Sequence, residues 1–310
     1  MNERKPLDGT AVGVMLTLCL IWGFQQVVLK AVADDITPLF QIALRSGLGA
    51  LLVALLMRRQ GVALWAADGT RGAGLLVGLL FALEFLFIGE GLRRTTASHL
   101  VVFLYTAPIF VALGLHWTVP AERLKPLQWL GVLLAFAGIA WSFLGGDNTP
   151  GAPGAPTRTS LAGDLLCVLA GLAWGATTVA VRLSPLARAP ATQTLFYQLA
   201  AGGILLTLMA LLLGQAQITP SPRALASLAF HVVVVAFGSF LAWFWLLRHY
   251  LAAPLSVLSF LTPLCGVAFG VWLLDEPLEP GFVVGALLVC AGILLVSGQA
   301  WLRPPRTARN

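Results

Sequence analysis

The sequence predicts an all-α integral membrane protein whose ten transmembrane helices form two inverted five-helix repeats. Of its 310 residues, 58% are hydrophobic and only 10% are charged, and the mean hydropathy is +0.88. A soluble domain of this length could not bury so much apolar surface, so the chain must be surrounded by lipid. In addition, the motifs of the first half recur in the same order in the second half.

Ten hydrophobic runs of roughly 20 residues are each long enough to cross a hydrocarbon layer of ~30 Å as a helix. The first run follows a basic start but is too long for the apolar core of a signal peptide. A proline lies within the fourth and ninth runs, and another immediately precedes the fifth and tenth. In chain order, the runs lie near residues 10–31, 36–57, 72–92, 96–117, 127–144, 161–182, 191–214, 224–247, 253–274 and 281–301.

The internal repeat rests on matching positions at a nearly constant spacing. Because each copy has five spans, an odd number, the two copies must have opposite orientations in the membrane. Inverted repeats of this kind are typical of secondary transporters. The matches are 122–126 with 276–280, Trp22-Gly23 with Trp174-Gly175, and Pro108 with Pro263.

The repeat also predicts the organisation of the chain. We expect a first five-helix repeat over residues 1–144 and a second over 161–302, followed by a basic tail over 303–310. The segment 145–160 between the repeats is rich in Gly and Pro, which predicts a flexible linker.

The basic residues indicate the orientation of the protein. With the N-terminus in the cytoplasm, the inner segments carry thirteen Lys and Arg residues and the outer segments carry five. This is the positive-inside pattern, and it predicts a multi-pass membrane protein with both termini in the cytoplasm. The basic residues form no groove-sized cluster, so the expected partners are the lipid bilayer and a small-molecule substrate, and not nucleic acid. The pattern does not predict an oligomeric state.

The sequence lacks the usual motifs of ATP-driven transporters and of hydrolases. The sequence has no Walker loop, no His-Glu-x-x-His and no Gly-x-Ser-x-Gly. The histidines are scattered, and the four cysteines lie in the middle of spans without the spacing of metal ligands, so no metal or cofactor is expected. An intramembrane enzyme or a sensor stays open as an alternative because polar groups do lie within the spans.

Two charged residues, Arg45 and Glu84, lie deep inside the predicted spans. Arg45 in the second span and Glu84 in the third lie at similar depth, roughly 12–14 Å from the outer boundary at 1.5 Å per residue. A charge in hydrocarbon costs about 2.5 to 3.5 kcal/mol or more, so each needs a partner or a wet cavity. Two interpretations follow: a buried ion pair that orients the two helices, or two charges that contact the substrate's ammonium and carboxylate groups.

Aromatic residues predict the walls of a cavity. Trp22 and Trp174 occupy matching positions near mid-membrane, whereas tryptophans that anchor a protein to lipid belong at the interfaces. Packing of crossing helices at Gly23 and Gly175 is one explanation, and a substrate site at the repeat interface is the other. The remaining candidate substrate-binding residues are Gln26 and Thr178, one turn beyond the tryptophans, with Tyr105, its counterpart Phe260, Ser239 and Trp243.

Four further residues are candidates for gates or hinges. Glu90 and His99 lie about one turn inside the outer boundary, where they could form an outer gate or a proton site. Pro108 and Pro263 interrupt matched spans, either as hinges for alternating access or as static kinks.

The segment 91–98 (Gly-Leu-Arg-Arg-Thr-Thr-Ala-Ser), with Ala107-Pro108 and Glu122-Arg123-Leu124, resembles the EamA type of the drug/metabolite transporter superfamily. The second copy resembles it through Thr262-Pro263 and 275–278 (Asp-Glu-Pro-Leu). The resemblance implies a ten-helix carrier of a bacterial inner membrane, usually an exporter of amino acids, related metabolites or small toxic compounds.

The sequence therefore predicts a secondary transporter that exports aromatic or other neutral amino acids, or similar metabolites, by alternating access. A multidrug exporter of lipophilic cations is the alternative within transport, since aromatic walls and an acidic residue suit such solutes.

Overall fold

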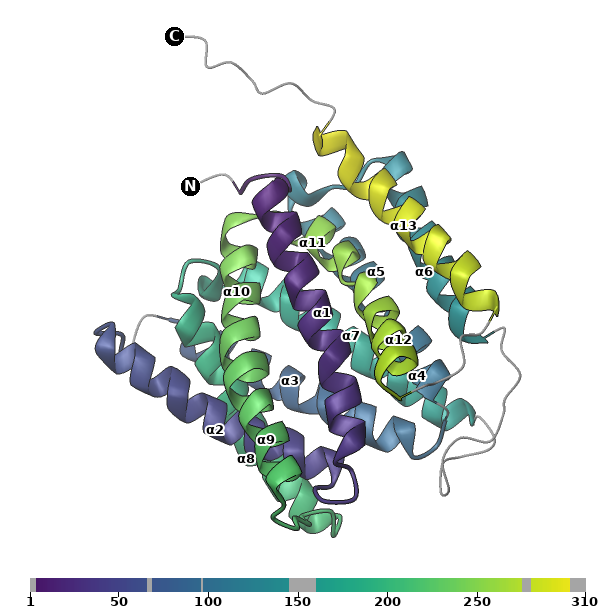
Figure 1. Cartoon of the computed structure of the whole chain (residues 1–310). Coiled ribbons are helices and arrows are strands. Elements are labelled where there is room, and N and C mark those ends of the chain that lie inside the picture. Colours follow the sequence, from purple (N-terminus) through teal and green to yellow (C-terminus); the bar gives the residue numbers. More distant parts are fainter. Residues whose placement is uncertain (1–3, 66–68, 96, 145–159, 275–279, 302–310) are drawn as a thin grey trace.

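The computed structural model describes residues 4–65, 69–95, 97–144, 160–274 and 280–301, and helices make up most of them. Figure 1 shows these helices as one bundle, with α1 beginning and α13 ending near the same end of the molecule. We call this end the N-terminal face. Within the described ranges, the only β-type pairings are the isolated bridges of Lys5 with Tyr250 and of Ile36 with Ile218. Residues 145–159 of the predicted linker and the whole of the predicted basic tail lie outside the described residues.

The helices follow the predicted spans closely. In the first repeat they are α1 (Gly9–Ala31), α2 (Pro38–Arg59), α3 (Arg71–Leu92), α4 (Ala97–Leu104), α5 (Ala107–Thr118), the short 3-10 helix η1 (Pro120–Glu122) and α6 (Pro126–Leu144). In the second they are α7 (Leu161–Leu183), η2 (Pro185–Ala187), α8 (Ala191–Leu212), α9 (Pro222–Phe230), the π-helix η3 (His231–Ser239), α10 (Phe240–His249), α11 (Ala252–Leu258), α12 (Leu261–Leu274) and α13 (Pro280–Trp301).

The prediction of an all-α membrane protein is confirmed. Eight spans are helices that are both long and apolar enough to cross a membrane, and the described parts of α6 and α13 are shorter apolar helices. Three spans are interrupted: α4 with α5 forms the fourth, α9 with η3 and α10 the eighth, and α11 with α12 the ninth.

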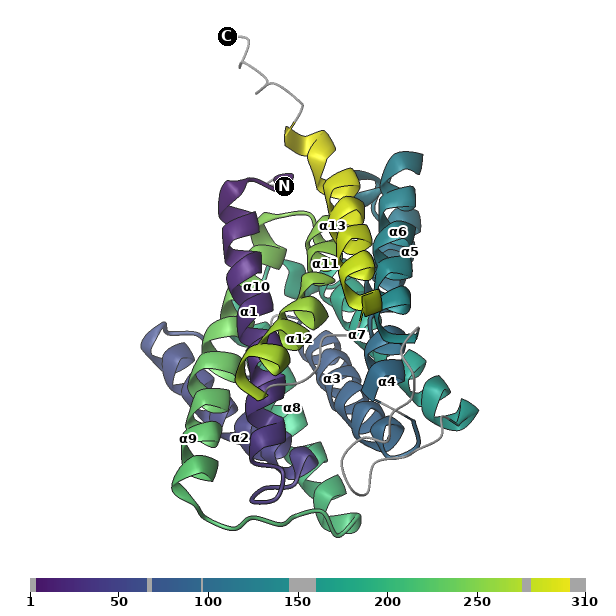
Figure 2. The same ribbon diagram turned by 45° about the vertical axis from the view of Figure 1, so that its right-hand side comes forward.

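The inverted repeat is visible in the contact between α6 and α13, which stay side by side in Figures 1 and 2. A Cβ atom on Gly131 would lie 2.7 Å from the carbonyl oxygen of Gly292, and one on Gly138 would lie 2.6 Å from that of Gly285. Gly131 corresponds to Gly285 and Gly138 to Gly292 in the repeat, so each close approach is the symmetry copy of the other. Small residues let the two backbones meet, as is usual between membrane helices.

A second symmetric pair of crossings involves the tryptophan–glycine motifs. A Cβ on Gly23 would lie 2.7 Å from the backbone nitrogen of Gly266 in α12, and one on Gly175 would lie 2.8 Å from Cβ of Phe110 in α5. The packing explanation for these motifs is therefore correct for the glycines. The glycines alone make these contacts, so the packing explanation does not account for the neighbouring Trp22 and Trp174.

The fourth and ninth spans break at equivalent places, directly before their prolines. Pro108 lies in the first turn of α5, where the helix needs no N–H donor from it. In both breaks a hydroxyl group closes the preceding turn: Thr106 donates to the carbonyl of Phe103 (2.6 Å) and Ser259 to that of Ser256 (2.6 Å). The sequence predicted the interruptions, and the structure shows short helices separated by a turn.

One buried ion pair joins the two repeats at the N-terminal face. Glu122, in η1 of the first repeat, has a fully buried side chain and lies 2.9 Å from the guanidinium of Arg182 at the end of α7. Its carboxylate also accepts the backbone N–H groups of Ala252 (3.1 Å) and Ala253 (3.3 Å), the first residues of α11. A carboxylate at a helix N-terminus is favourable because that end carries unpaired donors. Glu276, the counterpart of Glu122, lies outside the described residues.

Candidate substrate cavity

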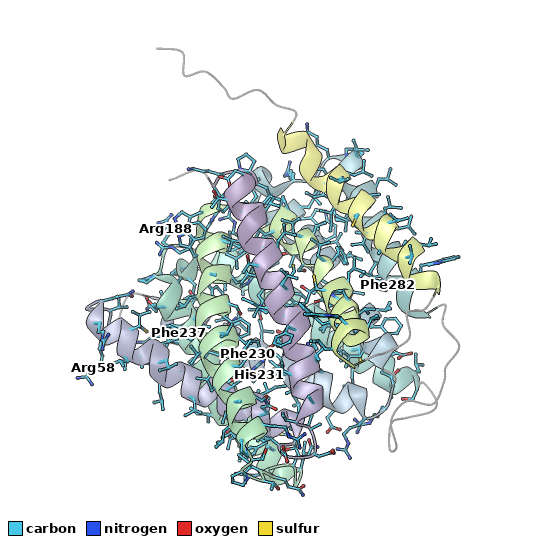
Figure 3. The ribbon with its side chains drawn as sticks, in the orientation of Figure 1. Arg58, Arg188, Phe230, His231, Phe237 and Phe282 are labelled. Atoms are coloured by element: carbon cyan, nitrogen blue, oxygen red, sulfur yellow. The ribbon has the colours of Figure 1, made fainter. Side chains whose placement is uncertain are left out.

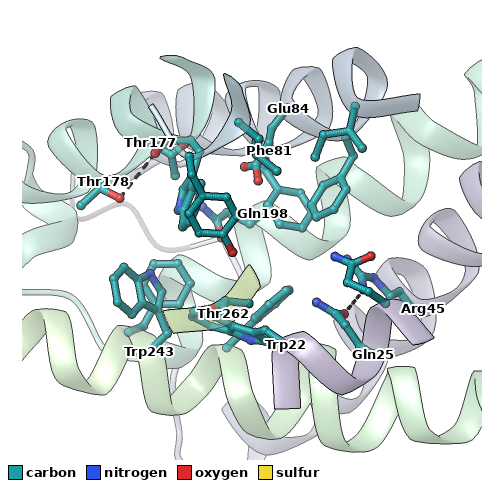
Figure 4. Close-up of a pocket in the computed structure, with 18 of the residues that line it drawn as sticks. Trp22, Gln25, Arg45, Phe81, Glu84, Thr177, Thr178, Gln198, Trp243 and Thr262 are labelled. Carbon is teal, nitrogen blue, oxygen red and sulfur yellow. Dashed lines mark hydrogen bonds between the residues drawn. The ribbon is translucent and has the colours of Figure 1, made fainter. Parts of the chain in front are cut away.

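A cavity of about 140 Å³ lies between the two repeats (Figure 4). Helices of both repeats form its wall, and each contributes between one and four residues. The lining residues are Trp22, Gln25 and Gln26 of α1; Arg45 of α2; Phe81, Glu84, Phe85 and Ile88 of α3; Leu104 and Tyr105 at the break of span four; Trp174, Thr177 and Thr178 of α7; Gln198 of α8; Phe240, Trp243, Phe244 and Leu247 of α10; and Thr262 of α12.

Arg45 is held by an amide group and by aromatic rings. Its side chain is buried, and Nη1 donates a hydrogen bond of 2.8 Å to Oε1 of Gln25. The guanidinium carbon lies 5.0 Å from the ring centroid of Phe85 and 5.9 Å from that of Phe240, within the range of cation–π attraction. Its Nε atom is buried and has no hydrogen-bond partner among the described residues. The charge of Arg45 is therefore only partly compensated by the protein.

Glu84 lines the same cavity from another wall, as Figure 4 shows. Within the described ranges its carboxylate accepts no hydrogen bond, and no ion pair joins it to Arg45. Of the two interpretations of these charges, the structure supports two separate charges that face one cavity. An anionic and a cationic group are thus both available to a solute.

Aromatic rings form two edge-to-face groups around the cavity. The Trp22 ring lies 5.8 Å from that of Trp243 at 70°, and its Nε1 donates a 2.9 Å hydrogen bond to Oγ of Ser239. Tyr105 lies 5.6 Å from Trp174 at 89°. Such edge-to-face contacts keep each ring in a defined orientation. The pairs place rigid apolar surfaces on both sides of the cavity.

Eight of the ten predicted substrate-binding residues line the cavity. Ser239 lies outside the lining, where it holds the indole of Trp22. Phe260 is fully buried behind Tyr105, with ring centroids 6.3 Å apart. Both of these residues support the wall without forming part of its surface.

Of the predicted gate and hinge residues, the three with described side chains, Glu90, Pro108 and Pro263, do not line the cavity. Glu90 forms ion pairs with Arg93 (3.0 Å) and Arg94 (2.6 Å) near the end of α3. The side chain of His99 lies outside the described residues. Pro108 and Pro263 are buried in α5 and α12, next to the helix breaks.

Several lining residues were missed although a helical pattern marks them. Phe81 and Ile88 lie three residues before and four residues after Glu84, and Phe240 and Leu247 lie likewise around Trp243. Phe85 and Phe244 each lie four residues after Phe81 and Phe240. Extending each predicted residue to its neighbours three and four positions away, and repeating the step once, would have found these residues. Gln198 and Thr262 carry no such local signal, because no predicted residue lies on the same face of their helices.

Comparison with known proteins assigns the family. The model of the EamA-like transporter family matches residues 9–144 and 161–298, which is most of the chain. The chain belongs to the EamA-like transporter family. It is therefore a multi-pass membrane transporter, and the family and relatives' names describe transporters and not enzymes.

Curated relatives of this EamA-like transporter are similar over most of their length. An uncharacterized transporter of Bacillus subtilis, YoaV, is 25% identical over 91% of this chain and 94% of its own. A probable amino-acid metabolite efflux pump of Salmonella typhimurium is 28% identical over 95% and 96%. The aromatic amino acid exporter YddG of Salmonella typhimurium is 31% identical over 58% of this chain and 59% of its own.

A solved crystal structure has the same fold as this EamA-like transporter. The two superpose with a TM-score of 0.78 at 18% sequence identity, over 95% of this chain and 99% of the other. At this identity the likeness concerns the arrangement of the helices alone.

Proposed function

We propose that this EamA-like transporter exports amino acids with aromatic or other neutral side chains, by alternating access of the cavity to the two sides of the membrane. The observation that carries the proposal is that Arg45 and Glu84 line one cavity without pairing with each other. Two charges inside a membrane protein that do not pair with each other cost free energy unless a ligand or water supplies a partner for each. A zwitterionic amino acid supplies both missing partners, a carboxylate for Arg45 and an ammonium for Glu84.

Size and chemistry of the walls support the same substrate class. A cavity of about 140 Å³ has room for several water molecules, and therefore for a small solute such as one amino acid. The rings of Trp22, Trp174 and Tyr105 offer surfaces on which an apolar or aromatic side chain stacks. Two relatives carry names that refer to amino-acid export.

The membrane and orientation belong to the same proposal. We place the protein in a bacterial inner membrane with the N-terminal face toward the cytoplasm, because most Lys and Arg residues then lie on the cytoplasmic side. The two repeats, 1–144 and 161–302, move as units against each other around the cavity between them.

The test is counterflow in proteoliposomes with labelled amino acids, their amides, their decarboxylated amines and one lipophilic cation. Arg45→Gln should raise KM for amino acids about ten- to a hundredfold and leave KM for the amides almost unchanged, since it removes a charged hydrogen-bond donor. Glu84→Gln should raise KM for every solute that carries an ammonium group, namely the amino acids, their amides and the decarboxylated amines. Arg223→Gln and Asp34→Asn remove exposed charges outside the cavity and serve as matched controls.

Export of lipophilic cations is the second candidate, favoured by the uncompensated carboxylate of Glu84 and the aromatic walls. Uptake of the cation alone, lost in Glu84→Gln and retained in Arg45→Gln, would replace the amino-acid proposal with this one.

A further inference from the structure

A second and much larger hollow, of about 1470 Å³, opens at the N-terminal face. Its wall is formed by the segment before α1, the end of α7, the η2 loop and the end of α10. Figure 3 shows Arg188 at this end of the molecule, near the start of α1. The charged and titratable residues of the wall are Arg4, Lys5, Arg182, Arg188, Arg248 and His249, and no Asp or Glu lines it. We call this hollow the basic vestibule.

The basic vestibule lies in line with the substrate cavity. A small hollow of about 10 Å³ shares Phe244 and Leu247 with the cavity, and it shares Arg4, Ala187 and Arg248 with the vestibule. The three spaces therefore form one series. The barrier between vestibule and cavity consists of an apolar layer, Phe244 with Leu247, and a basic layer, Arg4 with Arg248.

Part of the positive charge of the basic vestibule is uncompensated. Arg182 is paired with Glu122, and Arg4 donates to the carbonyls of Arg248 and Ala187, both at 3.1 Å. By contrast, the exposed side chains of Arg188 and Arg248 pair with no carboxylate in the described part of the chain, whereas Lys5 interacts electrostatically with Asp8. Like charges that line a concave wall reinforce one another and concentrate anions in the hollow.

We propose that the basic vestibule is a recruitment site for the carboxylate of the substrate, on the route between the N-terminal face and the cavity. The inference rests on the proposed function, because the vestibule serves solutes that Arg45 later binds through the same carboxylate. A zwitterionic amino acid has no net charge, so the guanidinium groups act on it at short range: they bind its carboxylate, turn its ammonium group away and lower its apparent KM. The same groups repel lipophilic cations. Orientation of the carboxylate toward the cavity follows from the position of Arg4 and Arg248 in the barrier.

The experiment measures KM for an amino acid and for its amide, with solute supplied at the N-terminal face in everted membrane vesicles. In the double variant Arg188→Gln/Arg248→Gln, KM for the amino acid should rise roughly three- to tenfold, whereas KM for the amide, which carries only the ammonium group and is repelled by the arginines, should not rise. The matched control is Arg58→Gln/Arg59→Gln, which removes two exposed arginines from the end of α2, well apart from Arg188 (Figure 3). That control should leave both values unchanged.

Salt provides a test that needs no variant. The attraction is screened as ionic strength rises, so KM of the unmodified protein for the amino acid should increase with salt and KM for the amide should not. If the double variant fails to fold, this measurement and the single variant Arg188→Gln, at an exposed loop position, decide the proposal.

The outcomes separate the two proposals. Absence of amino-acid transport by the unmodified protein would overturn the proposed function itself. Transport with the same KM in the double variant, or with an equal rise for the amide, would overturn the vestibule alone. An effect seen in proteoliposomes with anionic lipid and lost in neutral lipid would also overturn it, because the arginines would then bind lipid phosphate.

Discussion

At the scale of single residues, the buried charges have two different kinds of surroundings. Glu122 is fully satisfied by Arg182 and by two backbone N–H groups, which fixes the contact between the repeats. Arg45 and Glu84 are left incomplete and face a cavity. Arg182 also has two buried nitrogens, Nε and Nη1, without a hydrogen-bond partner among the described residues. The position on the cavity wall, and not an incomplete set of partners alone, therefore distinguishes Arg45 and Glu84.

Removing Glu122 should therefore destabilise the protein strongly. In Glu122→Ala, the guanidinium of Arg182 loses its carboxylate, and the start of α11 loses its acceptor. We expect the free energy of unfolding to fall by about 3–5 kcal/mol, measured as a lower Tm in detergent. Glu90→Ala is the control, because its arginine partners are largely exposed and such pairs contribute about 1 kcal/mol or less. Equal losses in both variants would show that Glu122 is not a structural contact.

At the scale of helices, close approach of backbones determines how the repeats join. The α6–α13 pair depends on glycines whose missing side chains leave room for the opposite carbonyl. Lipid gives little driving force for helix association, so packing of this kind has to supply it. The breaks before Pro108 and Pro263 and the π-helix η3 shorten regular helix next to the cavity, where irregular backbone is tolerated.

A methyl group at this contact should separate the two helices. Gly131→Ala places Cβ 2.7 Å from the carbonyl of Gly292, and the backbones must move apart. We expect a loss of about 1–3 kcal/mol, seen as a lower Tm in detergent. Gly13→Ala in α1 is the control, since its Cβ would meet nothing within 4 Å; alanine favours helix there by up to about 1 kcal/mol. A Tm that falls as much for Gly13→Ala as for Gly131→Ala would contradict this account.

At the scale of the whole molecule, the inverted repeats place two matching sets of helices around one cavity. Charge is distributed unevenly between the two faces, with the basic vestibule at the N-terminal face. On the opposite side, the α1–α2 and α8–α9 connections meet through the bridge of Ile36 with Ile218 and a 2.7 Å hydrogen bond from the N–H of Thr219 to the carbonyl of Asp35.

The orientation can be tested with single cysteines. Arg58→Cys, at the end of α2, and Arg223→Cys, at the start of α9, put exposed thiols on opposite sides of the predicted membrane. A membrane-impermeant maleimide should label Arg223→Cys in intact cells and Arg58→Cys only in everted vesicles. The unmodified protein is the control for its own four cysteines. The reverse pattern would place the N-terminal face outside.

The sequence by itself determined the class, the spans and the repeat, because the length and hydrophobicity of a run depend only on neighbouring residues. It also indicated most of the cavity, through symmetric tryptophans and two charges in apolar runs. Only the tertiary structure decided which face of each helix meets the cavity, and it brought in Gln198 and Thr262. The reason is physical: in lipid, outward and inward faces are both apolar, so the hydrophobic pattern that separates them in soluble proteins is lost. The same holds for contacts made across the repeats, such as Glu122 with Ala252 and Ala253.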